Sequence, residues 1–546
     1  MAVGLDKVAE QRDFSAGMWR SVREDLVPRN GVVDAYNYLL DNAGSLYKRG
    51  GTTYRTSQLL GSATWLPFIW DGFLTGGVQR TVIASTGQFG RVNADGTVTA
   101  LGGSGMAIPG RAAVFQGVLY FPGGATYNGT VIGTSPKIAD FYAVAGNRLF
   151  AATGDTIAFS DIGAGGVSTT TFAANDYHQV PEGVQTIGLE GLRNALVAFT
   201  TGGVWVYSNI GYDLTDSAGN VQQRVDRYSR DLILWGNAGI AAWEGGLVVP
   251  GLDDVWVMQL GVASEAPSPF QRVSKSISRL YREYVARGYS PGQACVYRAH
   301  YYLPILNGTS VVDMLVCRLD MAGGDPEARP WTHLGDFGAQ TPALTVRTSA
   351  SSPRQPEFIG TDGNLGKVLN LAHLDPKLSV ARDANGSAPR YSVQFADLPT
   401  GPLNKNTIVK VRIGYELGEM PADSVTTPVD TFWGLFDWGG ADWGTTPEDL
   451  AFQGEPELTL TELQGSAPPG QPEWGLFDWG QAEWGLTSGA ETFADTAPPD
   501  EFGLNPKTWN MAKIRRFARF RLDGRNATSH SALNWLEIYV RSNGRR

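Results

Sequence analysis

The sequence predicts an all-β protein: a β-propeller of about six or seven blades, followed by a C-terminal β-sandwich-like module with a long acidic Trp-rich insertion. Three observations lead there. Glycine is abundant, with 68 among 546 residues, and aromatic residues make up 11%, which is typical of turn-rich β structure. Short apolar runs joined by Gly- or Asp-centred turns return about every 30–50 residues. Several runs are apolar almost throughout, which predicts strands covered on both faces.

The recurring phrase is a β-hairpin. The clearest pair aligns Val204-Trp205-Val206 with Val255-Trp256-Val257. A radial stack of small sheets covers both faces of each strand, so we assign residues 60–375 to the propeller, with an array of β-sandwiches as the alternative. The predicted hairpins are TVIASTGQFGRVNADGTVTAL (81–101), GVLYFPGGATYNGTVIG (117–133), RLFAATGDTIAFSDIG (148–163), ALVAFTTGGVWVYSN (195–209), GLVVPGLDDVWVMQL (246–260) and HYYLPILNGTSVVDMLVCRLD (300–320).

One helix is expected, at SKSISRLYREYVARGY (274–289), because its apolar side chains fall on one face. Ser274 or Ser276 is expected to cap its start and Gly288 to end it. A helix packed on the edge of a sheet is preferred over a partner-binding helix.

The flanks of the propeller form two further regions. Residues 1–59 are predicted to be an N-terminal arm with the first strands, and residues 376–546 a C-terminal β module. Strand patterns at TIVKVRIGYEL (407–417), KIRRFARFRL (513–522) and WLEIYV (535–540) support the module. The basic face of 513–522 is interpreted as a solvated surface, with contact to nucleic acid as the alternative.

An acidic insertion is predicted at 413–506, which holds 18 Asp and Glu and no Lys or Arg. It contains one phrase written twice, WGLFDWGGADWG (433–444) and WGLFDWGQAEWG (474–485). We interpret the aromatic side chains as packing that holds a long loop with no sheet of its own, in part against a neighbouring subunit. A glycan site and a cation-binding rim are the alternatives. The candidate residues are Trp433, Trp438, Trp443, Trp474, Trp479 and Trp484.

No catalytic, cofactor or metal motif stands out in the sequence. The five histidines are scattered, and none forms H-E-x-x-H. GTDGNLGK (360–367) departs from the P-loop pattern, and RDANGS (382–387) lacks calcium-loop spacing, so both are read as turns. Cys295 and Cys317 are expected to be buried free thiols of a protein made in a reducing cytoplasm. We therefore expect no enzyme and no cofactor, although paired carboxylates of a glycoside hydrolase need only spatial proximity.

The chain shows no apolar run of the roughly 18–20 residues that span a bilayer. Its first residues, MAVGLDKVAEQRD, lack the pattern of a signal peptide. No membrane span is expected.

The N-terminal stretch resembles a class of tailed-bacteriophage proteins that includes packaged-DNA stabilisation and tail-nozzle proteins. The phrases are Phe14-Ser15-x-Gly17, Leu26-x-Pro28-x-x-Gly31, Ala35 and Asn37, and Asp41-x-x-Gly44-x-Leu46-x-Lys48-Arg49-x-Gly51-Thr52. Later phrases are similar too, at 188–207, 236–258 and in the C-terminal strands.

The resemblance implies a structural subunit of a virion tail, made in the bacterial cytoplasm. It implies a ring, usually of six copies, that forms the nozzle or hub at the distal end of the tail, where DNA is retained and then exits. Partners would be other copies, other tail proteins above and below, and passing double-stranded DNA held without sequence specificity. A channel face formed by the acidic insertion would repel the phosphate backbone. Two alternatives remain: a tail-tip protein that binds host glycan through the Trp-rich insertion, and a propeller glycoside hydrolase.

Overall fold

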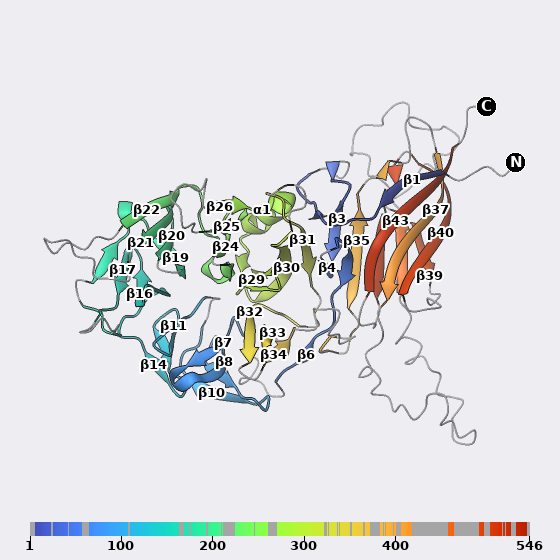
Figure 1. Ribbon diagram of the computed structural model, residues 1–546. Coiled ribbons are helices and arrows are strands. Elements are labelled where there is room, and N and C mark those ends of the chain that lie inside the picture. The colour runs from blue at the N-terminus through green and yellow to red at the C-terminus, as the bar shows by residue number, and fades with distance from the viewer. Residues whose placement is uncertain are drawn as a thin grey trace, which may run out of the picture. The chain divides into compact units, whose positions relative to one another are not determined.

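The computed structural model divides the chain into two compact units, residues 52–372 and residues 1–51 with 373–546, which are described separately. Nearly all of the ordered elements are strands (Figure 1). The structure describes residues 6–22, 26–41, 43–56, 65–106, 110–162, 169–173, 176–192, 195–208, 210, 224–244, 246–259, 270–321, 325, 327–335, 337, 339–349, 352–363, 366–371, 383–385, 387, 389–396, 398–399, 406–417, 457–462, 491–495, 503–515, 517–518, 520–525 and 531–542.

The 52–372 unit is a β-propeller. Its described residues form six four-stranded antiparallel sheets, which confirms the predicted architecture. The sheets are β7 (Phe68–Leu74), β8 (Val78–Ala84), β9 (Phe89–Val92) and β10 (Val98–Gly102); β11 (Ala113–Phe115), β12 (Val118–Tyr120), β13 (Ala125–Tyr127) and β14 (Ile132–Thr134); β15 (Phe141–Ala145), β16 (Arg148–Thr153), β17 (Thr156–Phe159) and β18 (Tyr177–Gln179); β19 (Thr186–Leu192), β20 (Ala195–Thr200), β21 (Gly203–Ser208) and β22 (Arg224–Ser229); β23 (Ala241–Trp243), β24 (Gly246–Pro250), β25 (Val255–Met258) and β26 (Phe270–Arg272); and β32 (Leu344–Ser349), β33 (Ser352–Asp362), β34 (Lys367–Asn370) and β6 (Thr53–Tyr54).

A strand from the start of the unit closes the ring. β6 pairs with β34, so the last sheet in the chain takes its outer strand from the first residues of the unit. The first strand of that sheet, β32, contacts β7 of the first sheet, and the two sheets lie side by side in Figure 1. This closure joins residues that are far apart in the sequence.

A further set of strands lies between the fifth sheet and the last one. It comprises β27 (Ser290–Pro291), β28 (Cys295–Tyr297), β29 (His300–Asn307), β30 (Ser310–Arg318) and β31 (Trp331–Leu334). β28 contacts both β23 and β32, so the first strands of successive sheets follow one another around the unit.

The predicted hairpins are present, and inner strands such as β20 and β21 are buried on both faces. On β20 and β21, Leu196 and Trp205 belong to the core shared with the preceding sheet, whereas Val197 and Val204 belong to the core shared with the following one. Alternation along a strand sends successive side chains to opposite faces, and both faces are apolar here because a neighbouring sheet covers each of them.

The expected helix is present as a 3-10 turn, η5 (Lys275–Ile277), followed by α1 (Ser278–Ala286). Gly288 ends it with a φ of 75°, as predicted. The predicted serine cap is wrong, because no side-chain cap bond is made. Ser274 instead donates its hydroxyl to Asp254 Oδ1 at 2.8 Å, since the buried carboxylate competes for that hydroxyl.

The second unit consists of two sheets. One joins β4 (Tyr38–Leu40), β5 (Leu46–Lys48), β43 (Ser531–Ser542), β37 (Asn406–Leu417) and β40 (Gly503–Arg515), with β1 (Asp6–Gln11) also paired to β43. The other contains β2 (Gly17–Met18), β3 (Gly31–Tyr36), β35 (Arg390–Phe395), β42 (Phe520–Arg525), β38 (Glu457–Glu462) and β39 (Glu491–Asp495). A short pair, β36 (Leu398–Pro399) and β41 (Phe517–Ala518), completes the unit.

The two sheets of this unit contact each other through aromatic side chains. Tyr38 of β4 packs edge-on against Tyr391 of β35, with ring centroids 5.5 Å apart. The first 51 residues fall within the predicted N-terminal arm with the first strands (1–59). Strands of this stretch pair with C-terminal strands, as β1 does with β43 and β3 with β35.

The predicted insertion 413–506 needs a correction. β37 runs on to Leu417 and β40 starts at Gly503, so both ends of the range belong to long paired strands. Between them, β38 and β39 form a hairpin, and β38 also pairs with β42, so the segment contributes two strands to the second sheet of this unit. The alternating apolar and polar residues of ELTLTE (457–462) are the pattern that predicts this strand.

Candidate functional site

The six tryptophans proposed as a packing or interface site lie outside the described residues. Their role therefore remains a prediction from the sequence. The residues are Trp433, Trp438, Trp443, Trp474, Trp479 and Trp484. The structure does place the residues of the N-terminal phrases, and these form the first candidate site.

Arg49 lies at the centre of a fully buried polar cluster. Its Nη1 and Nη2 donate to Asp383 Oδ1 and Oδ2 at 2.8 and 2.9 Å, and both side chains are 0% exposed. Its Nε donates to Asn37 Oδ1 at 2.9 Å. Asn37 has a φ of 59° and donates its side-chain amide to the Arg390 carbonyl at 2.6 Å. A planar guanidinium that donates two parallel bonds to one carboxylate fixes both groups in position.

The neighbouring Lys48 is also 0% exposed. Burial lowers the pKa of its amine to about 7; the positive charge of Arg49 acts in the same direction and Asp383 against it. Its Nζ lies 5.9 Å from the centre of the Tyr391 ring. The cluster therefore brings two basic groups and one acid together without access to solvent, which makes it a structural element rather than a binding surface.

Asp383 comes from the RDANGS phrase. The phrase is a turn, as predicted: the Asp383 amide donates to the Ser387 carbonyl at 2.8 Å, and the Ser387 amide donates to Asn385 Oδ1 at 2.9 Å. The sequence carries no signal for the ion pair of Asp383, because a partner 334 residues away leaves no local pattern.

The propeller carries a second, half-buried polar group near the first strands of its sheets. Arg111, which precedes β11, forms an ion pair with Glu190 of β19 and donates to the Ile240 carbonyl, which precedes β23. Burial raises the pKa of Glu190, and Arg111 opposes that shift. Because these residues come from three different sheets, Arg111 spans the space that the first strands surround.

Gln293 makes a similar bridge between the first and last sheets. Its side-chain oxygen accepts from the Ile69 amide at 3.1 Å, and its side-chain nitrogen donates to the Ile69 and Leu344 carbonyls at 2.5 and 3.2 Å. Like Arg111, this side chain links different sheets of the propeller by hydrogen bonds.

A histidine and an aspartate lie together beside α1. His333 Nδ1 is 3.2 Å from Asp313 Oδ1, and the Tyr284 hydroxyl donates to Asp313 Oδ2 at 2.7 Å. The three residues come from β31, β30 and α1 and connect the helix to the strands. The sequence analysis did not single out this group, because the residues are well separated in the chain.

Both cysteines are free, as predicted. Burial raises the thiol pKa of Cys295 and of Cys317. Thiols with raised pKa values are poor nucleophiles at neutral pH. Among the residues that the structure describes, no three His, Cys, Asp or Glu side chains are grouped so that they could hold a metal ion. No helix in the described part of the chain is long and apolar enough to cross a membrane.

Comparisons with known proteins add the following. No protein-family model and no curated protein matches the chain. A solved structure of catalytically inactive virginiamycin B lyase from Staphylococcus aureus with quinupristin is 11% identical, with a TM-score of 0.30, over 50% of this chain and 92% of that chain. The AfRom2 CNH domain is 10% identical, with a TM-score of 0.32, over 59% and 98%. The Pan2 WD40 domain of Neurospora crassa is 11% identical, with a TM-score of 0.35, over 61% and 97%. At these scores the similarities carry no argument about activity.

Proposed function

We propose that this chain is a non-enzymatic structural subunit of a bacteriophage tail, at the nozzle or hub through which DNA leaves the particle. The basis is the resemblance of the N-terminal and hairpin phrases to that class of tail proteins. One observation supports it best: Asn37, Lys48 and Arg49, three residues of the resembling phrases, are buried in one cluster with Asp383. Residues in such positions maintain a fold, as expected for phrases shared among structural parts.

The path of DNA in this proposal runs between subunits and not through the propeller of one subunit. Arg111 lies among the first strands of the propeller sheets and is bonded to residues from two other sheets. A duplex would therefore need a ring of several copies, and the subunits' outer surfaces would line the channel. Acidic surfaces facing this channel would let the phosphate backbone pass without binding it.

The first test is the mass of the purified full chain in solution, measured by light scattering and by native mass spectrometry, with negative-stain images. Closed rings with a central hole are the expected result. A monomer that stays monomeric up to millimolar concentration, and that cleaves or binds bacterial surface glycan, would contradict the proposal in favour of a hydrolase or a glycan-binding protein.

A second test locates the protein in particles. Antibodies raised against the purified chain would be applied to phage particles released by cells that carry the sequence. The proposal expects label at the distal end of the tail in electron micrographs. Label confined to material outside the particles would contradict it.

A further inference from the structure

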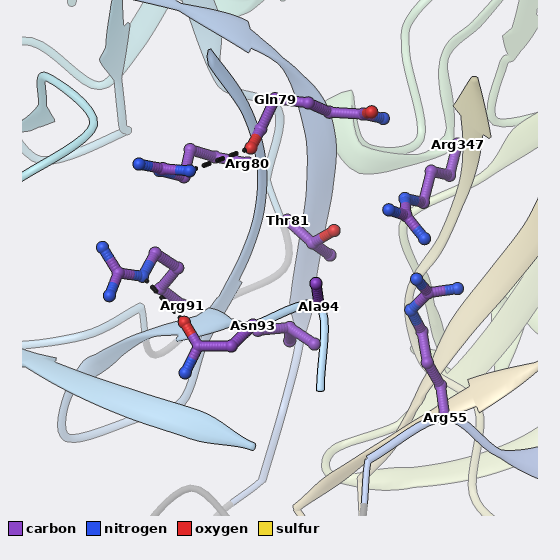
Figure 2. A pocket seen from close by; sticks show the side chains of 9 residues that line it. Arg55, Gln79, Arg80, Thr81, Arg91, Asn93, Ala94 and Arg347 are labelled. Carbon is purple, nitrogen blue, oxygen red and sulfur yellow. Dashed lines mark hydrogen bonds between the residues drawn. The ribbon is translucent and has the colours of Figure 1, made fainter. Parts of the chain in front are cut away.

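The propeller contains a cavity of ≈ 230 Å³ between its first and last sheets (Figure 2). The ring closure brings two arginines to it, Arg55 after β6 and Arg347 on β32, and both form ion pairs with Glu357 Oε2. Asp71 Oδ2 also lies 3.5 Å from Arg347 Nε. These charges are balanced within the fold, so the cavity calls for no charged ligand. A group with unused reactivity lies elsewhere, at an exposed turn.

Five asparagines of the chain precede a glycine, at positions 30, 128, 307, 385 and 543. An Asn-Gly pair rearranges without an enzyme, because glycine has no Cβ to keep its backbone nitrogen away from the side-chain amide carbon of the asparagine. The nitrogen attacks that carbon, ammonia leaves, and water opens the resulting succinimide ring to aspartate or isoaspartate. The reaction needs a side-chain amide that can rotate and a glycine N–H that makes no other bond. The pair at 543–544 lies outside the described residues.

The hairpin of β29 and β30 carries one of these pairs at its turn. Asn307 ends β29 and pairs with Ser310, so Gly308 and Thr309 form a two-residue turn. A φ of 59° suits glycine at the first position of such a turn. All four residues are exposed, and a Cβ on Gly308 would meet no atom within 4 Å.

The two reacting groups of this turn are available. Within the described part of the chain, no hydrogen bond holds the Asn307 side-chain amide or the Gly308 N–H. The attack requires a rotation of the Asn307 backbone and side chain. Open space around Gly308 allows that rotation without displacing a neighbouring residue.

Asn128 is also exposed, but hydrogen bonds fix its side-chain amide. Its Oδ1 accepts from the backbone amides of Thr130 and Val131, both at 3.0 Å. Arg80 Nε donates to the Gly129 carbonyl at 3.3 Å and holds the same turn. The amide of Asn128 cannot turn toward the Gly129 nitrogen unless it breaks both of its bonds to the backbone.

Asn385 is exposed and fixed in the same way. Its Oδ1 accepts from the Ser387 amide at 2.9 Å and from the Ser387 hydroxyl at 2.7 Å. Exposure therefore does not separate Asn307 from Asn128 and Asn385, whereas the hydrogen bonds of the side-chain amide do.

Asn30 is held at both reacting groups. The Gly31 N–H donates to the Pro28 carbonyl at 2.9 Å, so the attacking nitrogen is engaged. The Asn30 side-chain nitrogen donates to the Ser15 hydroxyl at 3.0 Å. Gly31 is buried and belongs to β3, which leaves no room for the rearrangement.

We propose that Asn307 is a site of spontaneous modification, where the Asn307-Gly308 pair rearranges through a succinimide to aspartate and isoaspartate. The side-chain nitrogen leaves as ammonia and one oxygen of water enters, so the turn gains a negative charge. In isoaspartate the main chain runs through the former side-chain carbon and is one methylene longer. The pairing of Asn307 with Ser310 is then lost, and the hairpin is shortened from its turn.

The test follows each Asn-Gly pair in the purified full chain, kept folded at pH 8.5 and 37 °C. Peptide mapping by mass spectrometry with electron-transfer dissociation separates asparagine, aspartate and isoaspartate at each position. We expect Asn307 to be converted at least fivefold faster than Asn30, Asn128 or Asn385. In water labelled with ¹⁸O, each molecule converted at Asn307 should carry one labelled oxygen.

Asn128 is the matched control, because Asn-Gly-Thr is the local sequence at both 128–130 and 307–309. In concentrated urea, where the fold is lost, the two rates should agree within about twofold. Ser387→Ala removes one of the two donors to Asn385, so it should speed conversion at Asn385 at least twofold and leave the rate at Asn307 unchanged.

Two variants identify the product in the folded protein. Asn307→Gln should lose the acidic species that ion-exchange chromatography separates after incubation, and Asn128→Gln should keep it. The proposal is overturned if Asn307 is converted no faster than Asn128 in the folded chain. It is also overturned if urea leaves the ratio of the two rates unchanged, since the local sequence and not the fold would then set the rates.

Discussion

Arg49 and Asp383 form a bidentate ion pair between two side chains that are both 0% exposed, and 334 residues separate them in the sequence. Arg49 follows β5, near the start of the chain, whereas Asp383 lies in a turn ahead of β35. The pair therefore joins the two stretches of chain that make up the non-propeller unit. The whole propeller sequence lies between them, so this unit can form only after the propeller has been synthesised.

The first prediction concerns this pair. Arg49→Met leaves the Asp383 carboxylate buried without its partner, which should lower the free energy of unfolding of this unit by about 3–5 kcal/mol. Urea unfolding followed by tryptophan fluorescence and by circular dichroism measures it. The double variant Arg49→Met/Asp383→Leu should recover much of the loss, because no charge is then left buried.

The control for this prediction is a surface pair. Arg287 and Glu283 form an i,i+4 ion pair on α1, with side chains 56% and 49% exposed. Arg287→Gln should leave the free energy of unfolding nearly unchanged, because exposed ion pairs contribute little to stability. Equal losses from Arg49→Met and Arg287→Gln would mean that the buried pair contributes no more than a surface pair.

Local sequence patterns predict most of the propeller, whereas its long-range contacts could not be predicted from the sequence. Hairpins such as 195–209 were recognised because an apolar run, a glycine turn and a second run are adjacent in the sequence. The ion pair of Arg49 and the position of Arg347 beside Arg55 depend on partners about three hundred residues away. One sequence without relatives holds no signal for such pairings.

The terminal regions show the same limit. β1 and β3 pair with β43 and β35, which are more than three hundred residues away, so the sequence predicts first strands in this region but not their partners. The serine cap failed because Asp254, which attracts the hydroxyl of Ser274, lies on a hairpin outside the helix. The aromatic phrases at 433–444 and 474–485 remain interpretations from the sequence alone.

The second prediction is a pH dependence from Lys48. Burial lowers the pKa of its amine to about 7 in the folded state, against about 10.4 when the chain is unfolded. Between these values the unfolded chain binds more protons than the folded one, so stability should rise as pH increases from 7. Below pH 7 Lys48 is protonated in both the folded and the unfolded state, so its effect on the free energy of unfolding does not change with pH.

Urea midpoints of the non-propeller unit at pH 7.0, 7.75 and 8.5 test this prediction, since both cysteines belong to the propeller and the ordinary pKa of tyrosine lies above that range. Lys48→Met should make the midpoints less dependent on pH and should raise the midpoint at pH 7. If the slope with pH is the same in Lys48→Met and in the unaltered protein, another group causes it.

The third prediction compares two buried tyrosines. The Tyr207 hydroxyl is buried and has no hydrogen-bond partner among the residues that the structure describes, and burial raises its pKa to about 12. The Tyr281 hydroxyl, equally buried, donates to the Gly251 carbonyl at 2.6 Å. Tyr207→Phe should therefore leave stability unchanged or raise it, whereas Tyr281→Phe should lower it by about 1 kcal/mol.

Both phenylalanine variants lose one oxygen and keep the aromatic ring, so each is the control of the other. Differential scanning calorimetry of the propeller transition measures both. A loss with Tyr207→Phe as large as that with Tyr281→Phe would reveal a bound water or another partner at the Tyr207 hydroxyl.

The fourth prediction concerns the centre of the propeller, where Arg111 pairs with Glu190. Arg111→Gln removes the positive charge that opposes the effect of burial, so the pKa of Glu190 should rise further above its ordinary value. In the folded variant Glu190 then binds a proton that it gives up in the unfolded chain. The stability that this proton provides is complete below the unfolded pKa, near 4.3, and is lost as pH rises through the folded pKa. The free energy of unfolding of the variant should therefore be closest to that of the unaltered protein near pH 4.5 and lower than it by several kcal/mol at pH 7.

Urea unfolding at both pH values measures the difference, with Arg111→Gln/Glu190→Gln as the control that has no carboxylate to titrate. A deficit of the single variant that is the same at both pH values would show that Arg111 acts through its bond to the Ile240 carbonyl and not through Glu190.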